Sequence, residues 1–180
     1  KISVIVPAFN EERVLAASLA SIRGAMAAFR ERGWSSELIV CDNNSTDRTA
    51  AIAAAAAATV VFEPINQIGR ARNSGARAAT GDWLIFVDAD SQPSLALFAE
   101  VAAQIQRGDI LAGGSTVKLD DDDFWCNFWA GLWNRISRWR RYMAGSFIFC
   151  DAGAFREVGG FGEELFVAEE LELSLKLKKL

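Results

Sequence analysis

The chain has 180 residues, and its 51% hydrophobic and 23% charged residues fit one globular domain and exclude a disordered or fibrous protein. Its 19 basic and 23 acidic side chains give a formal charge of −4, so we expect no general surface for nucleic acids or other polyanions. Because the sequence contains no His, acid–base or metal chemistry must fall to carboxylates, with Lys, Tyr or Cys as minor options.

Short apolar runs alternate with helical patterns over the first 106 residues. Strands are predicted at 2–6, 38–41, 59–62 and 84–87. The helices that follow them are predicted from an N-cap at Asn10 to Gly33, from a cap at Ser45 or Thr46 to about Ala58, over 69–79, and from about Ser94 to Gln106. This alternation predicts an α/β fold with a mostly parallel central sheet and helices on both faces.

The rest of the chain is predicted to hold strands at 110–117 and 145–150 and helices at 152–158 and 169–179. Its three Cys are odd in number and widely spaced, which is typical of a reducing compartment, so we expect a cytoplasmic location. Lys1 already lies in a strand-like run and Leu180 ends a helix-like run. We therefore expect the chain to be part of a longer protein.

Two carboxylates, Asp88 and Asp90, directly follow the fourth predicted strand. In a largely parallel sheet the ligand lies outside the carboxyl ends of the strands. Two carboxylates at that place can bind one Mg²⁺ or Mn²⁺, which prefers oxygen ligands and commonly shares them with phosphates. The alternative is a turn-forming pair that caps the helix beginning near Ser94.

Other polar residues follow the second strand and open the third helix. Asp42 can accept hydrogen bonds from a ribose hydroxyl or a nucleobase, or form an Asx-turn or a cap before the next helix. Arg70 and Arg72 can face a diphosphate together with free backbone N–H groups, or form a solvated basic helix start. Neither a Walker A loop nor GxGxxG is present, which argues against P-loop NTPases and dinucleotide oxidoreductases.

Glu169 and Glu170 open the last predicted helix. Acidic residues in a first helical turn complement the helix dipole, and this alone accounts for the pair. In a chain without His, a glutamate here can also serve as a general base.

Together these segments resemble the family 2 glycosyltransferases, which are inverting enzymes of the GT-A fold. The resemblance runs through nearly the whole chain and is carried by 4–12 (VIVPAFNEE), 41–49 (CDNNSTDRT), 69–75 (GRARNSG), 81–90 (GDWLIFVDAD), 155–163 (FREVGGFGE) and 169–173 (EELEL). Each motif alone is weak evidence, whereas their occurrence in this order is strong.

The resemblance implies a site for a UDP- or GDP-linked sugar and a divalent metal, Mg²⁺ or Mn²⁺. Asp42 matches the residue that holds the nucleobase in the family. Nucleotide contacts are expected from Pro7, Ala8, Phe9, Asn10, Glu12, Asp42, Arg70, Arg72, Asp88 and Ala89. The metal is expected at Asp90 and Asp88, assisted by Gln92, which is similar to a residue of polyprenyl-phosphate sugar transferases.

The resemblance also implies a single in-line displacement, in which Glu170 takes the proton of an acceptor hydroxyl as the sugar is transferred with inversion. The family usually has Glu-Asp where this chain has Glu169-Glu170, so Glu170 is one methylene longer and Glu169 is the alternative base. We expect a nucleotide-sugar-binding half over 1–117 and an acceptor half over 118–180, with a carbohydrate or lipid-linked acceptor.

A Trp-rich segment at 124–142 has apolar residues at helical spacing and four Arg in its C-terminal half. One hypothesis is a helix that rests on a membrane or lies beside a lipid-linked acceptor. The alternative is a helix packed over the core or in a dimer interface. The preceding acidic run, 120–123, is predicted to be a solvated loop.

Three other functions share some of these features. A haloacid-dehalogenase-type phosphatase also has an Asp pair, but after its first strand. A sugar nucleotidyltransferase has a Gly-rich first loop with Arg and Lys, which this chain lacks. The third alternative is a module that binds a nucleotide sugar without turnover, because Glu170 departs from the family pattern.

Overall fold

The computed structural model describes residues 1–115, 146–164 and 169–180. Its strands are β1 (Ile2–Ala8), β2 (Ser36–Asp42), β3 (Thr59–Phe62), β4 (Trp83–Val87), β5 (Ala112–Gly114) and β6 (Phe147–Asp151). Its helices are α1 (Leu15–Ala25), α2 (Ala27–Arg30), α3 (Thr49–Ala55), α4 (Ile68–Ala78), α5 (Leu95–Arg107), α7 (Ala152–Glu157) and α8 (Glu169–Leu177).

The strands form one six-stranded sheet in the order β3-β2-β1-β4-β6-β5. β1 pairs in parallel with β2 and β4, and β2 pairs in parallel with β3. Only β6 runs against its neighbours, β4 and β5. The predicted α/β fold with a mostly parallel sheet is therefore confirmed, and β6, from the second half of the chain, lies inside the same sheet.

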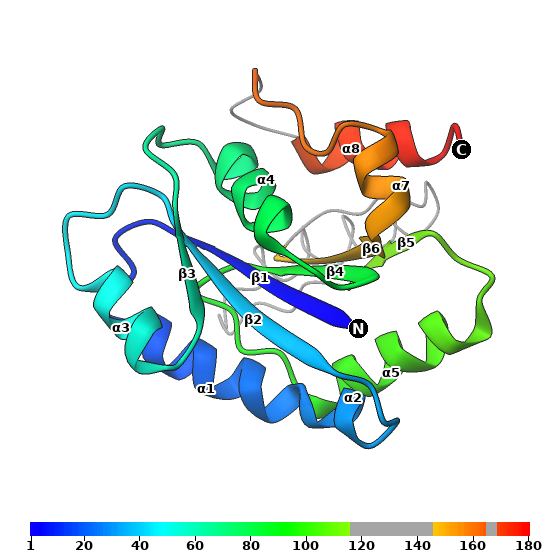
Figure 1. Cartoon of the computed structure of the whole chain (residues 1–180), viewed down its shortest axis with the longest axis horizontal. Helices are drawn as coiled ribbons and strands as arrows, with labels where there is room; N and C mark the ends of the chain where they lie inside the picture. The colour runs from blue at the N-terminus through cyan, green and yellow to red at the C-terminus, as the bar shows by residue number, and fades with distance from the viewer. Residues whose placement is uncertain (116–145, 165–168) are drawn as a thin grey trace, which may run out of the picture.

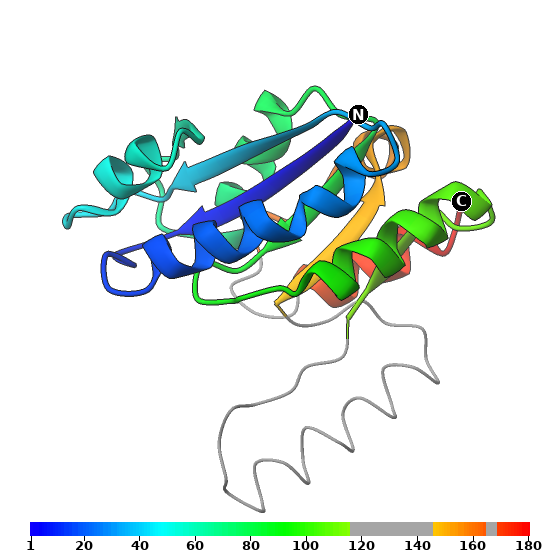
Figure 2. The ribbon, with the colours of Figure 1, turned by 90° about the horizontal axis from the view of Figure 1, so that it is seen from below.

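Helices cover both faces of the sheet, as predicted (Figure 1). Along β1 the side chains alternate between two hydrophobic clusters, since successive residues of a strand point to opposite faces. Val4 and Val6 pack with α1, α2 and α5, and Figure 2 shows α1 and α5 lying across this face. Ile5 packs in the cluster formed with α4, α7 and α8.

The close packing of α4 on β1 depends on a glycine. A Cβ atom at Gly75 would lie 2.4 Å from Cγ2 of Ile5, which is far inside van der Waals contact. The absence of a side chain at Gly75 lets α4 approach the sheet, and this approach brings the first turns of α4 to the carboxyl ends of the strands.

The N-caps predicted for the first two helices are wrong. Asn10 has a φ of 55° and lies in a turn before α1, where its Oδ1 accepts a hydrogen bond from the Thr46 N–H at 2.8 Å. Ser45 Oγ accepts one in return from the Asn10 N–H at 3.0 Å. These side chains join the loop after β1 to the loop after the neighbouring β2 instead of capping the helices that follow them, so α1 begins later, at Leu15, and α3 begins at Thr49.

Several boundaries also differ from the prediction. The first helix is interrupted at Met26, so that α1 and α2 are separate segments. Ala57, with a φ of 53°, follows the end of α3 and stops it before the predicted Ala58. The cap predicted at Ser94 is confirmed, because its side chain accepts a hydrogen bond from the Leu97 N–H at 3.2 Å.

The hypotheses for 120–123 and 124–142 fall on residues outside the described part of the chain. The division at residue 117 falls there too. Within the described ranges, no helix has the length and apolar character needed to span a membrane.

Candidate active site

A cavity of about 470 Å³ opens at the carboxyl ends of β1 and β4. Its lining residues are Pro7, Ala8, Phe9, Glu11, Asn43, Asn66, Gln67, Ile68, Asp88, Ala89 and Asp90. The parallel strands bring these segments to one edge, because each crossover returns the chain to the amino end of the next strand. The sheet therefore places the cavity where the strand order predicts a ligand.

The structure brings the predicted nucleotide-binding residues of two segments to this cavity. Pro7, Ala8 and Phe9 line one wall, and Asp88 and Ala89 line another. Phe9 is 47% exposed and therefore offers an open aromatic face. These two segments are neighbours because β1 and β4 are adjacent in the sheet.

Asn10 and Glu12 do not line the cavity. Oε2 of Glu12 pairs with Nε of Arg48 at 3.2 Å, and the Glu12 N–H donates to Asp47 at 3.0 Å. With Asn10, these contacts hold the loop after β1 against the loop after β2. Both residues thus shape the edge of the sheet from outside the cavity.

Asp42 is buried, and its Oδ1 accepts a hydrogen bond from the Ser45 N–H at 3.2 Å. This is a local bond to the backbone three residues further on, and Asp42 is not among the cavity-lining residues. Its neighbour Asn43 lines the cavity instead, which the sequence analysis missed. The available signal was its position directly after β2.

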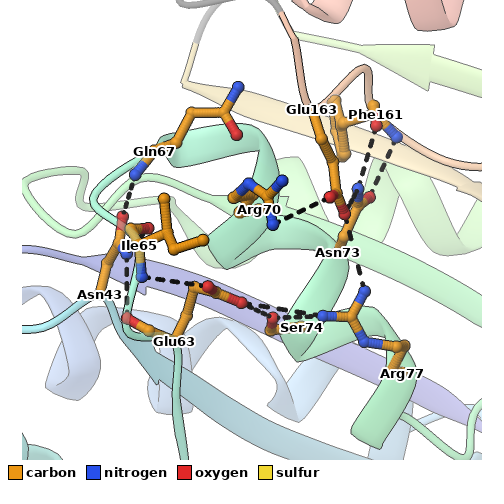
Figure 3. A network of polar contacts seen from close by, with 10 residues as sticks. All are labelled: Asn43, Glu63, Ile65, Gln67, Arg70, Asn73, Ser74, Arg77, Phe161 and Glu163. Atoms are coloured by element: carbon orange, nitrogen blue, oxygen red, sulfur yellow. Dashed lines mark hydrogen bonds and ion pairs between the residues drawn. The ribbon is translucent and has the colours of Figure 1, made fainter.

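Asn43 fixes the segment that enters α4 (Figure 3). Its Nδ2 donates to the carbonyl oxygens of Ile65, at 2.6 Å, and Glu63, at 3.2 Å. Its Oδ1 accepts a hydrogen bond from the Gln67 N–H at 2.9 Å. One buried amide therefore sets the backbone of 63–67, where Asn66 and Gln67 form a wall of the cavity.

Acidic side chains gather at the same cavity. Burial raises the pKa of Glu11, and the negative charges of Asp90, Asp47 and Asp88 raise it further. The pKa of Asp88 is also raised, mainly by burial and then by Asp90 and Glu170, although Arg72 acts in the opposite direction. Glu11 was not predicted as a site residue, although it lies in the 4–12 motif that follows the first strand.

This cluster of acids suits a bound cation. Within the described residues, no hydrogen bond or ion pair engages the side chain of Asp90 or of Glu11. No three His, Cys, Asp or Glu of those residues are grouped closely enough to hold a metal by themselves. The acids fit a metal that shares its oxygen ligands with a phosphate, as Mg²⁺ usually does. Gln92 is exposed and lies outside the cavity lining.

Arg70 and Arg72 differ sharply in their surroundings. Nη1 of Arg70 pairs with Oε2 of Glu163 at 3.2 Å, which ties α4 to the loop before α8. The Arg72 side chain is only 2% exposed, and its partners are Asp88, Glu169 and Glu170, at distances of 3.0, 3.0 and 3.1 Å. Arg72 is thus turned toward carboxylates, and neither arginine is among the residues that line the cavity.

The two glutamates at the start of α8 both reach Arg72 but differ in exposure. The side chain of Glu169 is 5% exposed, whereas that of Glu170 is 20% exposed. Glu170 is therefore the carboxylate of this pair that is accessible to a reacting molecule. Arg72 pairs with both Glu170 and Asp88. These two acids, predicted from motifs far apart in the sequence, therefore lie around the same guanidinium.

Comparison with known structures assigns the fold to the GT-A glycosyltransferases. A mannosyltransferase of Pyrobaculum calidifontis, solved in complex with GDP-mannose and Mn²⁺, superposes with a TM-score of 0.78 at 23% identity over 98% of this chain and 51% of that one. Staphylococcus aureus TarS (1–349), solved with UDP-GlcNAc, gives a TM-score of 0.74 at 24% identity over 98% of this chain and 53% of that one.

The chain belongs to glycosyl transferase family 2, whose family profile matches residues 3–159. An uncharacterised glycosyltransferase of Mycobacterium tuberculosis is 35% identical over 113 residues, which cover 63% of this chain and 47% of the relative. A PGL/p-HBAD biosynthesis glycosyltransferase of the same species is 27% identical over 97% of this chain and 68% of that protein. The first of these matches thus spans about half the length of the relative.

Proposed function

We propose that this chain is the catalytic part of a metal-dependent glycosyltransferase. It moves a sugar, with inversion, from a nucleoside-diphosphate sugar to a hydroxyl or lipid-phosphate acceptor. One observation carries the proposal: Asp88, beside the cavity, and Glu170, at the start of α8, contact the same guanidinium at 3.0 and 3.1 Å. The carboxylate expected on the donor side and the base expected on the acceptor side therefore lie within reach of one reaction centre.

The nucleoside diphosphate is assigned to the cavity at the carboxyl ends of β1 and β4. Its volume of about 470 Å³ is within the range of small-molecule sites. The aromatic face of Phe9 can stack on a base, and Asn66, from the segment between β3 and α4, is also part of the lining. The family neighbours that bind GDP-mannose and UDP-GlcNAc support a UDP- or GDP-linked sugar.

Asp90 and Asp88 are assigned to the metal, with Gln92 as a weaker candidate because it lies outside the cavity lining. Bound there, Mg²⁺ or Mn²⁺ supplies positive charge that offsets the charge growing on a diphosphate leaving group. Burial is the main cause of the raised pKa of Glu11 and of Asp88, and the negative charge of Asp90 adds to it in both, a charge that a bound cation would offset. The Mn²⁺ in the Pyrobaculum mannosyltransferase is consistent with this assignment.

Glu170 is assigned as the general base. Its side chain is four times as exposed as that of Glu169, 20% against 5%, and a base must reach the proton that it removes. Arg72 keeps Glu170 at the edge of the site facing Asp88. Glu169, buried on the same guanidinium, is assigned to holding the start of α8 in place.

Transfer or hydrolysis of a panel of UDP- and GDP-sugars tests the function, each with Mn²⁺, with Mg²⁺ and with EDTA. We expect turnover of at least one donor that requires metal and is lost in Asp90→Asn. The matched control is Asp109→Asn. Asp109 is an exposed acid that follows the C-terminal end of α5 and does not line the cavity. Metal-independent turnover, or equal activity of the two variants, would contradict the proposal. Binding of a donor without turnover would favour the binding module.

A further inference from the structure

Arg72 lies on α4, far in sequence from most of the groups that it contacts. Its Nη2 pairs with Oδ1 of Asp88, and its Nη1 pairs with Oε1 of both Glu169 and Glu170. The two glutamates are 97 and 98 residues away along the chain. A single side chain thus joins the end of β4 to the beginning of α8.

The charges around Arg72 do not balance. Three carboxylates surround one guanidinium, and within the described residues all the ion pairs of those carboxylates go to Arg72. Arg72 and Glu169 are almost fully buried, so water screens their charges poorly. Without the guanidinium, Asp88 and the two glutamates of α8 would repel one another. The ion pairs that hold the start of α8 beside Asp88 would be lost.

The shape of the side chain matters as well as its charge. A guanidinium is a planar fork whose two terminal nitrogens serve different partners, whereas a Lys ammonium is a single point of charge. In this structure Nη2 pairs with Asp88, and Nη1 pairs with Glu169 and Glu170. The Arg72 Cζ also lies 5.2 Å from the ring centroid of Phe161, which fixes the plane of the fork from one side.

The loop before α8 has its own attachments to α4 (Figure 3). The Asn73 side chain pairs twice with the backbone of Phe161: Nδ2 donates to its carbonyl and Oδ1 accepts from its N–H, each at 3.0 Å. Arg70 pairs with Glu163 at 3.2 Å. Because these contacts hold 161–163 on α4 in addition to the ring contact of Arg72, the hydrogen bonds of the Arg72 fork can serve a narrower task than holding the domain together.

We propose that Arg72 is a positioning residue for sugar transfer, which rests on the function proposed above. Its fork sets the distance and angle between Asp88, on the donor side, and Glu170, on the acceptor side. It does so through the carboxylates and does not bind the donor itself. This differs from the diphosphate contact predicted from the sequence.

Arg72→Lys tests this inference because it keeps the positive charge and removes the fork. We expect its kcat to fall by about 100-fold or more, as small displacements of reacting groups produce. We expect the affinity for Mn²⁺ with UDP or GDP, measured by calorimetry, to stay within threefold of the wild type. Hydrogen exchange should become faster in 169–177 and stay unchanged in α4.

Arg77→Lys is the matched control, since Arg77 lies on the same helix with a side chain that is 63% exposed. Arg72→Gln is a second variant that keeps much of the side-chain volume, and cooperative thermal unfolding checks each protein. The inference is overturned if Arg72→Lys keeps its kcat, if it loses nucleotide affinity in parallel with kcat, or if α8 exchange is unchanged. Failure of both Arg72 variants to fold would make Arg72 a folding residue and would also overturn it.

The result for the proposed function can be distinguished from these outcomes. A wild-type chain that turns over none of the donors contradicts the proposed function itself. In that case faster exchange in α8 of Arg72→Lys, with Mn²⁺–nucleotide affinity retained, still supports the joining of the carboxylates by Arg72. Unchanged exchange refutes it.

Discussion

Acidic side chains at the two ends of the parallel strands have pKa values that are shifted in opposite directions. At the amino ends, Glu37 accepts hydrogen bonds from Ser3 Oγ at 2.6 Å and the Thr80 N–H at 2.8 Å, and it pairs with Lys1 Nζ at 2.8 Å. Burial raises the pKa of Glu37, but these hydrogen bonds outweigh it and lower the pKa to about 2. The Glu37 carboxylate therefore joins β2 to β1 and to the segment that precedes β4.

At the carboxyl ends, burial and neighbouring negative charges raise the pKa of Glu11 and of Asp88. Arg72 is the only cation of the described residues that pairs with Asp88, and it is shared with two glutamates. Charges that lack partners inside the protein destabilise it and attract a partner from outside. The comparison teaches that the acid at one edge of the sheet is held by contacts within the protein, whereas the acids at the other edge lie where we propose binding and catalysis.

The largest expected effect is on turnover at the carboxyl edge. Glu170→Gln removes the proposed base while keeping a side chain of similar size, so we expect kcat on a hydroxyl acceptor to fall by about 10²- to 10⁴-fold. Glu172→Gln is the matched control, because Glu172 lies on the same helix and pairs with Lys176. Normal activity of Glu170→Gln on such an acceptor would refute the base assignment. On an acceptor phosphate, which is already anionic, appreciable activity should remain.

At the amino edge the expected effect is on stability. Glu37→Gln loses hydrogen bonds to a charged acceptor and should lower the free energy of unfolding by about 1–3 kcal/mol. Metal-dependent turnover should be unchanged, because Glu37 lies at the opposite end of the strands from the cavity. Urea denaturation followed by an activity assay measures both quantities. A loss of kcat without loss of stability would break the contrast between the two edges.

The contribution of Glu37 to the free energy of unfolding should depend on pH. The folded pKa of Glu37, about 2, lies below its ordinary value of 4.5, so its contribution to stability is complete above pH 4.5 and is lost as the pH falls toward 2. The difference in unfolding free energy between the wild type and Glu37→Gln should therefore shrink across this window. A difference that stays constant as the pH falls would show that Glu37 does not stabilise the fold as a charged group.

The smallest expected effect has the opposite sign. The raised pKa of Glu11 means that its charged form is disfavoured in the folded state, and this penalty is present at neutral pH and disappears below the ordinary pKa. Glu11→Gln should thus raise the free energy of unfolding at neutral pH, by no more than about 0.5 kcal/mol. Matched denaturation curves without metal measure the change, and a destabilised variant would contradict it.

Local sequence patterns correctly predicted the features that depend on neighbouring residues in the chain. Apolar runs gave the strands of the sheet, and the position of Asp88 and Asp90 after β4 placed them at the cavity. The caps at Asn10 and at Ser45 or Thr46 failed because these side chains bond across two loops, and a pattern within one segment contains no information about such partners.

The same limit applies to the site. Arg72 was predicted to face a diphosphate because it lies near a helix start. Its partners within the described residues come from the segment after β4 and from α8, the latter nearly 100 residues further on, and no local pattern contains them. Glu11 and Asn43 were missed because their roles depend on the adjacency of β1, β2 and β4 in the sheet. Which carboxylate is buried, Glu169 or Glu170, is decided only by the packing of α8.

The most direct test measures nucleotide binding through the melting temperature. It asks whether the acids at the carboxyl ends of β1 and β4 form the donor site. Ligands that bind the folded state raise the melting temperature according to their affinity. We predict that UDP or GDP raises the melting temperature of the wild type and of Glu37→Gln only when Mn²⁺ is present, and that Asp90→Asn abolishes this rise. An equal rise without Mn²⁺, or in Asp90→Asn, would contradict the account.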